Sequence, residues 1–243
     1  VVIPCFQAES TILELGSRLT NTLAEITPNF EIILVDDGSL DATWDLIMLL
    51  AQTNPQVSGI KLSRNFGQHN AITAGLKNST GDWIVVMDCD LQDRPEEIKN
   101  LYQKTHEGYQ VVVGIRSDRK DNVVKRISSF IFYFIFQKMT GSNFDKKIGN
   151  FGIYSRKVIE SVLDLKEQHR SFGLLALWVG YSRAEVGIIH DSRGSGKSNY
   201  KLTHRLALAL DSIVSHTNKL LYLAIKSGMF ISGTSLLFVT YLV

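Results

Sequence analysis

The first half of the chain alternates short apolar runs with longer segments of helical spacing. The apolar runs predict five strands, at residues 1–5, 31–35, 57–62, 83–87 and 110–114. Helical spacing appears at residues 11–26, 42–51 and 69–77. Asp41 is a suitable N-cap for the second helix, and Gly81 is a suitable break before the fourth strand. Strands that alternate with helices indicate a parallel sheet built from βαβ units.

Past residue 116 the apolar pattern becomes helical. An apolar and aromatic face runs from Val123 to Phe134, with basic residues on both flanks. This pattern is typical of a helix at the membrane interface, although a buried helix or a subunit contact would show it too. A second apolar stripe at residues 202–213 fits either core packing or an interfacial helix.

The last segment is apolar enough to cross a membrane. Residues 220–243 carry a single charge, on Lys226, and a bilayer-spanning helix needs roughly 20 apolar residues. A buried core helix is the alternative. Both ends of the chain look truncated, because Val1 already lies inside a strand-like run and the apolar segment reaches the last residue.

Composition excludes several classes of protein. The 243 residues are 44% hydrophobic and 21% charged, which is typical of a folded chain. The two cysteines, Cys5 and Cys89, lie in or beside apolar runs and are expected to be small buried thiols in a reducing compartment. The sequence has no zinc-binding spacing, no P-loop and no G-x-G-x-x-G motif.

Charge is distributed unevenly along the chain. Residues 1–103 carry 6 basic and 14 acidic side chains, whereas residues 104–243 carry 20 basic and 10 acidic ones. A uniformly basic nucleic-acid binder would not show this division, so we expect no nucleic-acid partner. The positive excess beside the C-terminal apolar segment favours a cytosolic location for the preceding part.

Carboxylates follow two of the predicted strands. Asp36 and Asp37 end the second strand, and Asp88 and Asp90 end the fourth. In open sheets of parallel strands, ligands bind beyond the carboxyl ends of the strands. The sequence therefore places a candidate binding site at this edge of the sheet.

Residues 88–93 point to a metal ion. Their sequence, Asp-Cys-Asp-Leu-Gln-Asp, puts three carboxylates and an amide on a short turn. The repulsion among the carboxylates is costly unless a cation is bound. Mg²⁺ or Mn²⁺ takes few protein carboxylates and completes its shell with water and substrate phosphates, which suits a nucleotide diphosphate. A solvated acidic turn is the alternative.

The turn at residues 36–39, Asp-Asp-Gly-Ser, allows two interpretations. Its carboxylates can accept hydrogen bonds from a base imide or from ribose hydroxyls, and Gly38 allows close approach of the backbone. The other interpretation is an Asx-type turn that caps the next helix through Ser39 or Asp41. Both can hold together.

Several motifs form a set that extends through almost the whole chain. In the first half they are Ile-Pro-Cys-Phe at 3–6 with Glu9, Val-Asp-Asp-Gly-Ser at 35–39 with Asp41 and Thr43, Ser-Arg-Asn-Phe-Gly at 63–67, Thr-Ala-Gly-Leu at 73–76, and residues 87–93 with Pro95 and Glu96. Residues 113–116, 155–158, 178–181 and 196–198 with Arg193 also fit. The set resembles the family 2 glycosyltransferases. More narrowly, it is similar to their polyprenyl-phosphate branch, which includes bactoprenol glucosyltransferases and dolichyl-phosphate mannosyltransferases.

The resemblance implies a GT-A type α/β fold, with a Rossmann-like, mostly parallel sheet, helices on both of its faces, and C-terminal interfacial and transmembrane helices. Residues 1–117 would form the nucleotide-sugar-binding core. Residues 118–200 would form an acceptor-side part with an interfacial helix and a closing loop, and residues 201–243 a juxtamembrane helix and a truncated transmembrane segment.

The resemblance also implies roles for individual residues. The nucleotide-binding set would be Pro4, Phe6, Glu9, Asp36, Asp37, Ser39, Arg64, Asp88, Lys197 and Ser198. The metal, Mg²⁺ or Mn²⁺, would be held by Asp88, Asp90 and Gln92. The catalytic set would be Asp90, Asp93, Arg116, Arg126 and Arg193, because guanidinium groups suit phosphate oxygens in geometry and in charge.

Two positions depart from the family pattern. Asn150, in Gly-Asn-Phe at 149–151, stands where many relatives have an aspartate, and Asn199 follows Ser198 where relatives often have a lysine. Loss of the first carboxylate weakens any claim of a base there, while Lys197 can supply the charge from an earlier position. The Gln-x-x-Arg-Trp signature of processive synthases does not occur, which favours a single transfer.

The expected function is therefore inverting transfer of one sugar from a nucleotide-diphosphate sugar, with a UDP-sugar favoured, to a polyprenyl phosphate. We expect this at the cytosolic face of a bacterial plasma membrane, in a homo-oligomer. A lipid phosphate is already anionic, so positioning and charge neutralisation suffice. The alternative is a family 2 transferase that acts on a glycan or sugar hydroxyl and needs a base, for which Asp93 is the candidate. A nucleotide-binding membrane adaptor without turnover is a further alternative.

Overall fold

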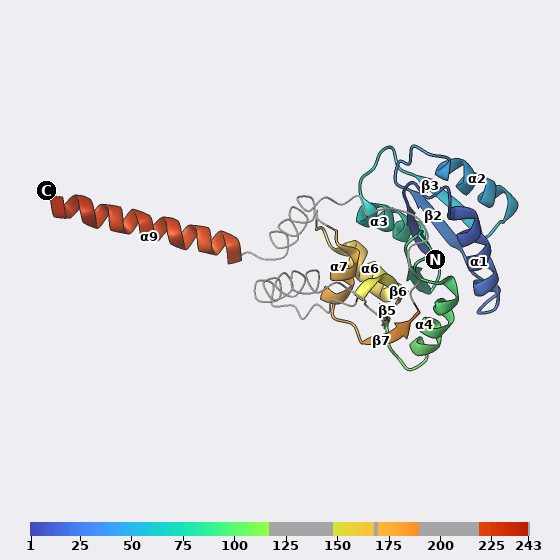
Figure 1. Cartoon of the computed structure of the whole chain (residues 1–243). Helices are drawn as coiled ribbons and strands as arrows, with labels where there is room; N and C mark the ends of the chain where they lie inside the picture. The colour runs from blue at the N-terminus through green and yellow to red at the C-terminus, as the bar shows by residue number, and fades with distance from the viewer. Residues whose placement is uncertain (117–147, 168–169, 190–218, 243) are drawn as a thin grey trace. The chain divides into compact units, whose positions relative to one another are not determined.

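The computed structural model describes residues 1–116, 148–167, 170–189 and 219–242 (Figure 1). The chain divides into two units, residues 1–119 with 147–196 and residues 120–146 with 197–243. The apolar face from Val123 to Phe134 and the stripe at residues 202–213 lie outside the described residues. The first unit holds the sheet, and of the second unit the structure describes one helix.

Seven strands form one sheet in the order β3-β2-β1-β4-β6-β5-β7. The strands are β1 (Val2–Cys5), β2 (Ile32–Asp36), β3 (Val57–Lys61), β4 (Trp83–Val86), β5 (Val111–Arg116), β6 (Ile148–Ser155) and β7 (Arg183–Ile188). Strand β6 is antiparallel to both of its neighbours, and the other pairs are parallel. All five strands predicted from apolar runs are confirmed, and so is the mostly parallel sheet.

Strands β6 and β7 lie in the stretch that we expected on the acceptor side, yet they pair with strands of the first half. Strand β6 contains Gly149, Asn150 and Gly152, which are residue types depleted in strands. Its conformation therefore depends on hydrogen bonds with β4 and β5. This long-range pairing left no signal in the local sequence.

Helices cover both faces of the sheet. They are α1 (Ile12–Ala24), α2 (Thr43–Thr53), α3 (Gln68–Asn78), the 3₁₀ helix η1 (Pro95–Glu97), α4 (Ile98–Thr105), α6 (Arg156–Asp164) and α7 (Phe172–Trp178). Helices α1, α2 and α4 pack on one face, and α3, α6 and α7 on the other. The three helices predicted in the first half are confirmed, as are the helices on both faces.

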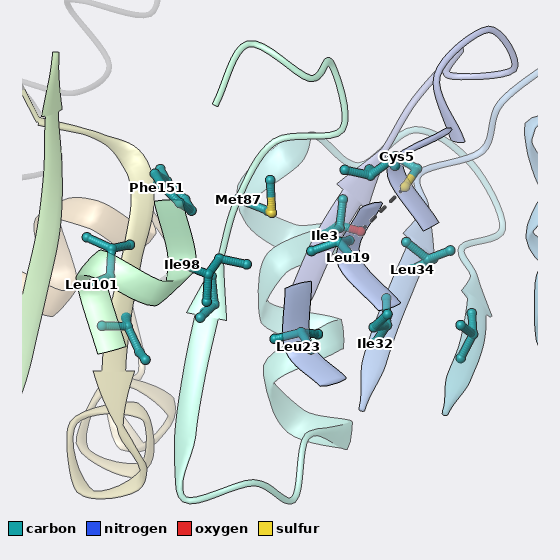
Figure 2. Packing of buried hydrophobic residues seen from close by; sticks show 14 of the residues in the cluster. Ile3, Cys5, Leu19, Leu23, Ile32, Leu34, Met87, Ile98, Leu101 and Phe151 are labelled. Carbon is teal, nitrogen blue, oxygen red and sulfur yellow. Dashed lines mark hydrogen bonds between the residues drawn. The ribbon is translucent and has the colours of Figure 1, made fainter. Parts of the chain in front are cut away.

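The sheet has one hydrophobic core on each face, because successive side chains along a strand point to opposite faces. On β1, Ile3 packs with α1 and α4, whereas Val2 packs on the opposite face with α3. On α1, Leu15, Leu19 and Leu23 repeat at helical spacing and face the first of these cores. Figure 2 shows Leu19 and Leu23 in this core with Ile3 of β1. Each such fully buried side chain contributes about 1.5–3 kcal/mol. The sheet is therefore a rigid platform for the loops at its edges.

The structure contains both the helix cap expected at Asp41 and the break expected at Gly81, although the cap is shifted by one residue. Helix α2 has Ala42 rather than Asp41 as its N-cap residue. The Asp41 carboxylate still caps the helix from one position earlier, because its Oδ1 accepts the N–H of Thr43 at 3.1 Å and the hydroxyl of Thr43 at 2.6 Å. Gly81 precedes β4 as expected, and its N–H donates to Glu31 Oε1 at 3.1 Å.

Both cysteines are free thiols, as expected. Cys5 is buried, whereas Cys89 is only partly buried. A hydrogen bond with Cys89, together with burial, raises the pKa of the Cys5 thiol well above its usual value. Cys5 is therefore protonated at neutral pH and packs as a small apolar side chain.

The described part of the second unit is helix α9 (Lys219–Leu242), 24 residues long. Within it, Ala224–Leu242 is long and apolar enough to cross a membrane, and none of that stretch is buried in the protein. At 1.5 Å per residue the helix is about 36 Å long, which matches the thickness of a bilayer core with some tilt.

Helix α3 packs so closely on the sheet that Gly75 has no room for a side chain. A Cβ there would lie 2.4 Å from Val2 Cγ1 and 3.0 Å from Val35 Cγ2, both in the core. We expect Gly75→Ala to lower the free energy of unfolding by about 1–3 kcal/mol, the cost of overpacking. Gly173→Ala is the matched control, since that helical glycine has open space around it. The control is expected to be neutral or stabilising. Chemical denaturation of both variants tests this, and equal stabilities would contradict it.

Candidate active site

The strand order changes direction between β1 and β4. From β1, the chain builds β2 and β3 on one side, and β4 then starts the other side of the sheet. In open α/β sheets, the crevice outside the carboxyl ends of strands at such a switch point is where ligands bind. Predicted site residues lie at the carboxyl ends of three strands there: Pro4 is on β1 and Phe6 follows it, Asp36 ends β2, and Asp88 follows β4.

The two aspartates after β2 are buried and differently bonded. Asp37 is 2% exposed, and its Oδ1 and Oδ2 accept the backbone N–H groups of Phe66 at 2.8 Å and Gly67 at 2.9 Å. Asp36 is fully buried, and its Oδ1 accepts the N–H of Ser39 at 3.0 Å. Within the described residues, Oδ2 of Asp36 has no hydrogen-bond partner. Asp37 thus fixes the loop that precedes α3, while Asp36 keeps one acceptor for another group.

Gly38 makes this arrangement possible. Its φ of +71° lies in the left-handed region, and a Cβ would lie 2.5 Å from the Arg64 carbonyl carbon and 2.7 Å from the Asn65 nitrogen. The loop at residues 64–67 therefore passes directly against the Asp-Asp-Gly-Ser turn. The close approach that we expected at Gly38 is made by this loop of the protein itself.

The loops after β1 and β2 hold each other. The Ser39 hydroxyl accepts the N–H of Gln7 at 3.0 Å. Glu9 accepts the N–H of Ala42 at 3.1 Å, and its own N–H donates to Asp41 at 3.3 Å. Gln7 has a φ of 51°, an uncommon conformation for a residue other than glycine. In the structure Glu9 and Ser39 thus connect the two loops, and their contact with a nucleoside stays a prediction.

Two aromatic rings are exposed beside these loops. Phe6 is 44% exposed and Phe66 is 42% exposed, although most large apolar side chains of the sheet unit are buried. The Arg64 guanidinium lies over the Phe66 ring, 4.2 Å from its centroid. Flat groups of this kind can stack against a base.

The acidic turn after β4 has a strained backbone. Leu91, between Asp90 and Gln92, has a φ of 58°, and such outliers persist where the surrounding structure enforces them. Here the Asp90 Oδ1 accepts the N–H of Gln92 at 3.2 Å, the Cys89 carbonyl accepts the hydroxyl of Thr11 at 2.8 Å, and the Leu91 side chain packs on the core. The turn is therefore held from both ends.

The third carboxylate of the turn is set apart. Asp93 is 3% exposed, whereas Asp88 and Asp90 are partly exposed. Among the described residues, no three side chains of His, Cys, Asp or Glu converge as a metal cage. The turn thus buries Asp93 while it leaves Asp88 and Asp90 at the edge, and the metal set of Asp88, Asp90 and Gln92 stays a prediction.

Asp88 receives two amide groups from distant segments. Its Oδ1 accepts a hydrogen bond from Nε2 of Gln68 at 2.5 Å and another from Nδ2 of Asn150 at 3.3 Å. The sequence marks Asn150 only as a departure from the family pattern, and it gives no signal for Gln68. Gln68 directly follows the motif at 63–67, but nothing in the local sequence identifies its partner.

The start of α3 is fixed beside Gln68. Burial lowers the pKa of His69 below its usual value, so its ring is neutral near pH 7. The Nδ1 atom of His69 accepts the N–H of Phe172 at 3.4 Å, which connects α3 to the first residue of α7. The amide of Gln68 is thus carried by a well-anchored helical turn.

The basic residues of the predicted site are only partly described. Arg116 is the last residue of β5 and pairs with Ile188 at the end of β7, so its backbone lies at the same edge of the sheet as Asp88. Its side chain lies outside the described residues, as do Arg126, Arg193, Lys197 and Ser198. Their roles stay predictions.

Comparison with known proteins identifies the family. The model of glycosyl transferase family 2 matches residues 1–163. The Bacillus subtilis glycosyltransferase YkcC is 35% identical over 98% of this chain and 74% of that protein. The undecaprenyl-phosphate 4-deoxy-4-formamido-L-arabinose transferase of Shewanella sediminis is 33% identical over 100% of this chain and 74% of its own length. The Pseudomonas aeruginosa enzyme of the same name is 34% identical, over 96% and 70%.

Solved structures show the same fold. Glucosyl-3-phosphoglycerate synthase from Mycobacterium tuberculosis, crystallised with Mn²⁺, UDP and glucosyl-3-phosphoglycerate, superposes with a TM-score of 0.61 at 17% identity. The match covers 88% of this chain and 76% of that chain. At this identity the likeness shows the fold alone, and it confirms the GT-A type architecture. With the family model and the relatives above, it follows that the chain belongs to the family 2 glycosyltransferases and resembles their polyprenyl-phosphate branch.

Proposed function

We propose that this glycosyltransferase moves one sugar, with inversion, from a UDP-sugar to a polyprenyl phosphate at the cytosolic face of a bacterial membrane. The observation that carries the proposal is that Asp36 ends β2 while Asp88 and Asp90 follow β4, so the three carboxylates lie at the carboxyl edge of the sheet on either side of β1. The relatives named as undecaprenyl-phosphate transferases support the class of acceptor. The helix Ala224–Leu242 supports attachment to a membrane.

A divalent cation fits the residues of the acidic turn. Asp88, Asp90 and Gln92 offer oxygen donors, and only two of them are carboxylates. Mg²⁺ and Mn²⁺ commonly use few protein ligands and complete their shell with water and phosphate oxygens. When bound, such an ion offsets the negative charge that develops on the departing diphosphate. The solved relative with Mn²⁺ and UDP supports the choice of ion.

The nucleoside side of the site is built from β1 and β2. The buried Oδ2 of Asp36 is an acceptor without a partner among the described residues, and a base imide or a ribose hydroxyl would satisfy it. Phe6, which follows the β1 residue paired with Asp36, presents an exposed ring, and Arg64 lies in the loop at residues 64–67. Asp37 contributes indirectly, because it holds that loop in place.

The acceptor side supports a lipid phosphate over a hydroxyl. A hydroxyl acceptor needs a base, and the candidate, Asp93, is 3% exposed. At position 150 the site has an amide that donates to Asp88 rather than a second carboxylate. A phosphate needs no base, so charge neutralisation by Arg116, Arg126 and Arg193 would suffice. Lys197 and Ser198 would close over the donor diphosphate.

A transfer assay on membranes tests the proposal. Membranes that contain the full chain are incubated with radiolabelled UDP-glucose, UDP-galactose, UDP-N-acetylglucosamine or GDP-mannose, and then extracted with organic solvent. Label is expected in the organic phase only with Mn²⁺ and added undecaprenyl phosphate, and a chelator should abolish it. Label found only in water-soluble glycan would favour the hydroxyl acceptor, and unchanged transfer with chelator would contradict the metal site.

A further inference from the structure

Two carboxamides meet one carboxylate oxygen at the edge of β4. Gln68 reaches Oδ1 of Asp88 from the first turn of α3, and Asn150 reaches the same oxygen from β6, at 2.5 Å and 3.3 Å respectively. The three residues come from segments far apart in the chain. Neither Gln68 nor Asn150 belongs to the site residues expected from the sequence.

The strand register places Asn150 at this position. In the antiparallel pair of β4 and β6, Val85 lies opposite Ile153 and Val86 opposite Gly152. Continued by two residues, the same register sets Asn150 opposite Asp88. Residues opposite each other in an antiparallel pair have Cβ atoms about 5 Å apart, within reach of short side chains.

Gln68 is placed just as firmly. The residue before it, Gly67, donates its N–H to Asp37 at 2.9 Å, and the residue after it, His69, accepts the N–H of Phe172 at 3.4 Å. The first turn of α3 is therefore fixed on two sides. The backbone of Gln68 is thus held in place, and its exposed side chain reaches Asp88 from this anchored turn.

The chemistry of an amide suits a carboxylate beside a cation. A neutral N–H group satisfies one oxygen and fixes the plane of the carboxylate without cancelling its charge. A lysine or arginine would also donate, but its positive charge would compete with the metal. We infer that Gln68 and Asn150 are positioning residues that orient the Asp88 carboxylate toward a divalent cation. The inference rests on the proposed metal site.

Mn²⁺ binding to the full chain in detergent tests the inference. Mn²⁺ alone is titrated, and the free ion is followed by electron paramagnetic resonance. Gln68→Ala and Asn150→Ala are each expected to raise the Kd by about 10–100-fold, the usual effect of partners behind metal ligands. The double variant should fall short of the product of the two effects, because both amides serve one oxygen.

Activity separates positioning from a structural role. In both variants the Mn²⁺ concentration for half-maximal transfer should rise, while kcat at saturating Mn²⁺ stays within about threefold of the parent. The thermal midpoint without metal should not change. Gln103→Ala, which removes an exposed glutamine from α4, is the matched control and should leave Mn²⁺ binding unchanged.

The outcomes distinguish this inference from the proposed function. If Asp90→Asn loses Mn²⁺ while Gln68→Ala and Asn150→Ala bind it as tightly as the parent, the metal site stands and the positioning role is overturned. A fall in kcat and thermal midpoint with unchanged Mn²⁺ affinity would also overturn it. If the parent binds no Mn²⁺, the metal site fails, and the inference fails with it.

Discussion

Asp90→Asn is expected to lower sugar transfer by about a thousandfold, because the amide cannot supply the negative charge that a divalent cation needs. The substitution should not disturb the turn. The Asp90 Oδ1 accepts the N–H of Gln92 at 3.2 Å, and the asparagine oxygen can accept the same bond. The loss should therefore appear in kcat and in Mn²⁺ affinity, with the thermal midpoint unchanged.

The measurement is radiolabel transferred to the organic phase per enzyme, at a series of Mn²⁺ concentrations. Asp45→Asn is the matched control, since Asp45 is an exposed carboxylate in the first turn of α2. It removes the same charge without touching the site and should leave the rate unchanged. Transfer by Asp90→Asn above about a tenth of the parent rate would refute the assigned role.

Gly38→Ala is expected to disrupt the nucleoside side of the site and to cost about 2–4 kcal/mol of stability. Two effects add. The φ of +71° is unfavourable for a residue with a side chain, and the new Cβ would meet the backbone of Arg64 and Asn65 at 2.5 to 2.8 Å. Because backbone cannot rotate away as a side chain can, the loop at residues 64–67 must move. The hydrogen bonds from Phe66 and Gly67 to Asp37 would then be lost or stretched.

Gly108→Ala separates the two effects. Gly108 has a φ of +93° but open space where a Cβ would lie, so only the backbone cost of about 1 kcal/mol applies. We expect Gly38→Ala to lose both stability in denaturant titration and UDP affinity in calorimetry. Gly108→Ala should lose a little stability and no affinity. Equal behaviour of the two variants would show that the contact with the loop is unimportant.

Much of the fold could be read from local patterns. Strands β1, β2, β4 and β5 were predictable because each is a largely apolar run bounded by turn residues, and β3 because it alternates with predicted helices although Ser58 and Gly59 interrupt it. Helices α1, α2 and α3 were predictable because their apolar residues recur at helical spacing. Strands β6 and β7 were not, since glycines and polar residues interrupt them and pairing with β4 and β5 supplies their stability.

The site was partly predictable for a similar reason. Asp36 and Asp88 could be placed at the binding edge, because a residue that ends a parallel strand must lie at the carboxyl end of the sheet. The bonds from the loop at residues 64–67 to Asp37 could not be foreseen. Neither could the burial of Asp93, which the spacing had grouped with Asp88 and Asp90. Both depend on how loops pack after the strands are in place.

The sequence by itself determined which strands and helices form in the first half, the acidic turns that follow β2 and β4, and an apolar C-terminal segment long enough for a membrane. These properties depend on neighbours within a few residues, and apolar periodicity records them directly. The tertiary structure alone decided that β6 runs antiparallel between β4 and β5. That choice brings Asn150 opposite Asp88, with Gln68 on the same oxygen. Strand order and register arise from hydrogen bonds between segments far apart in the chain, and no local pattern specifies them.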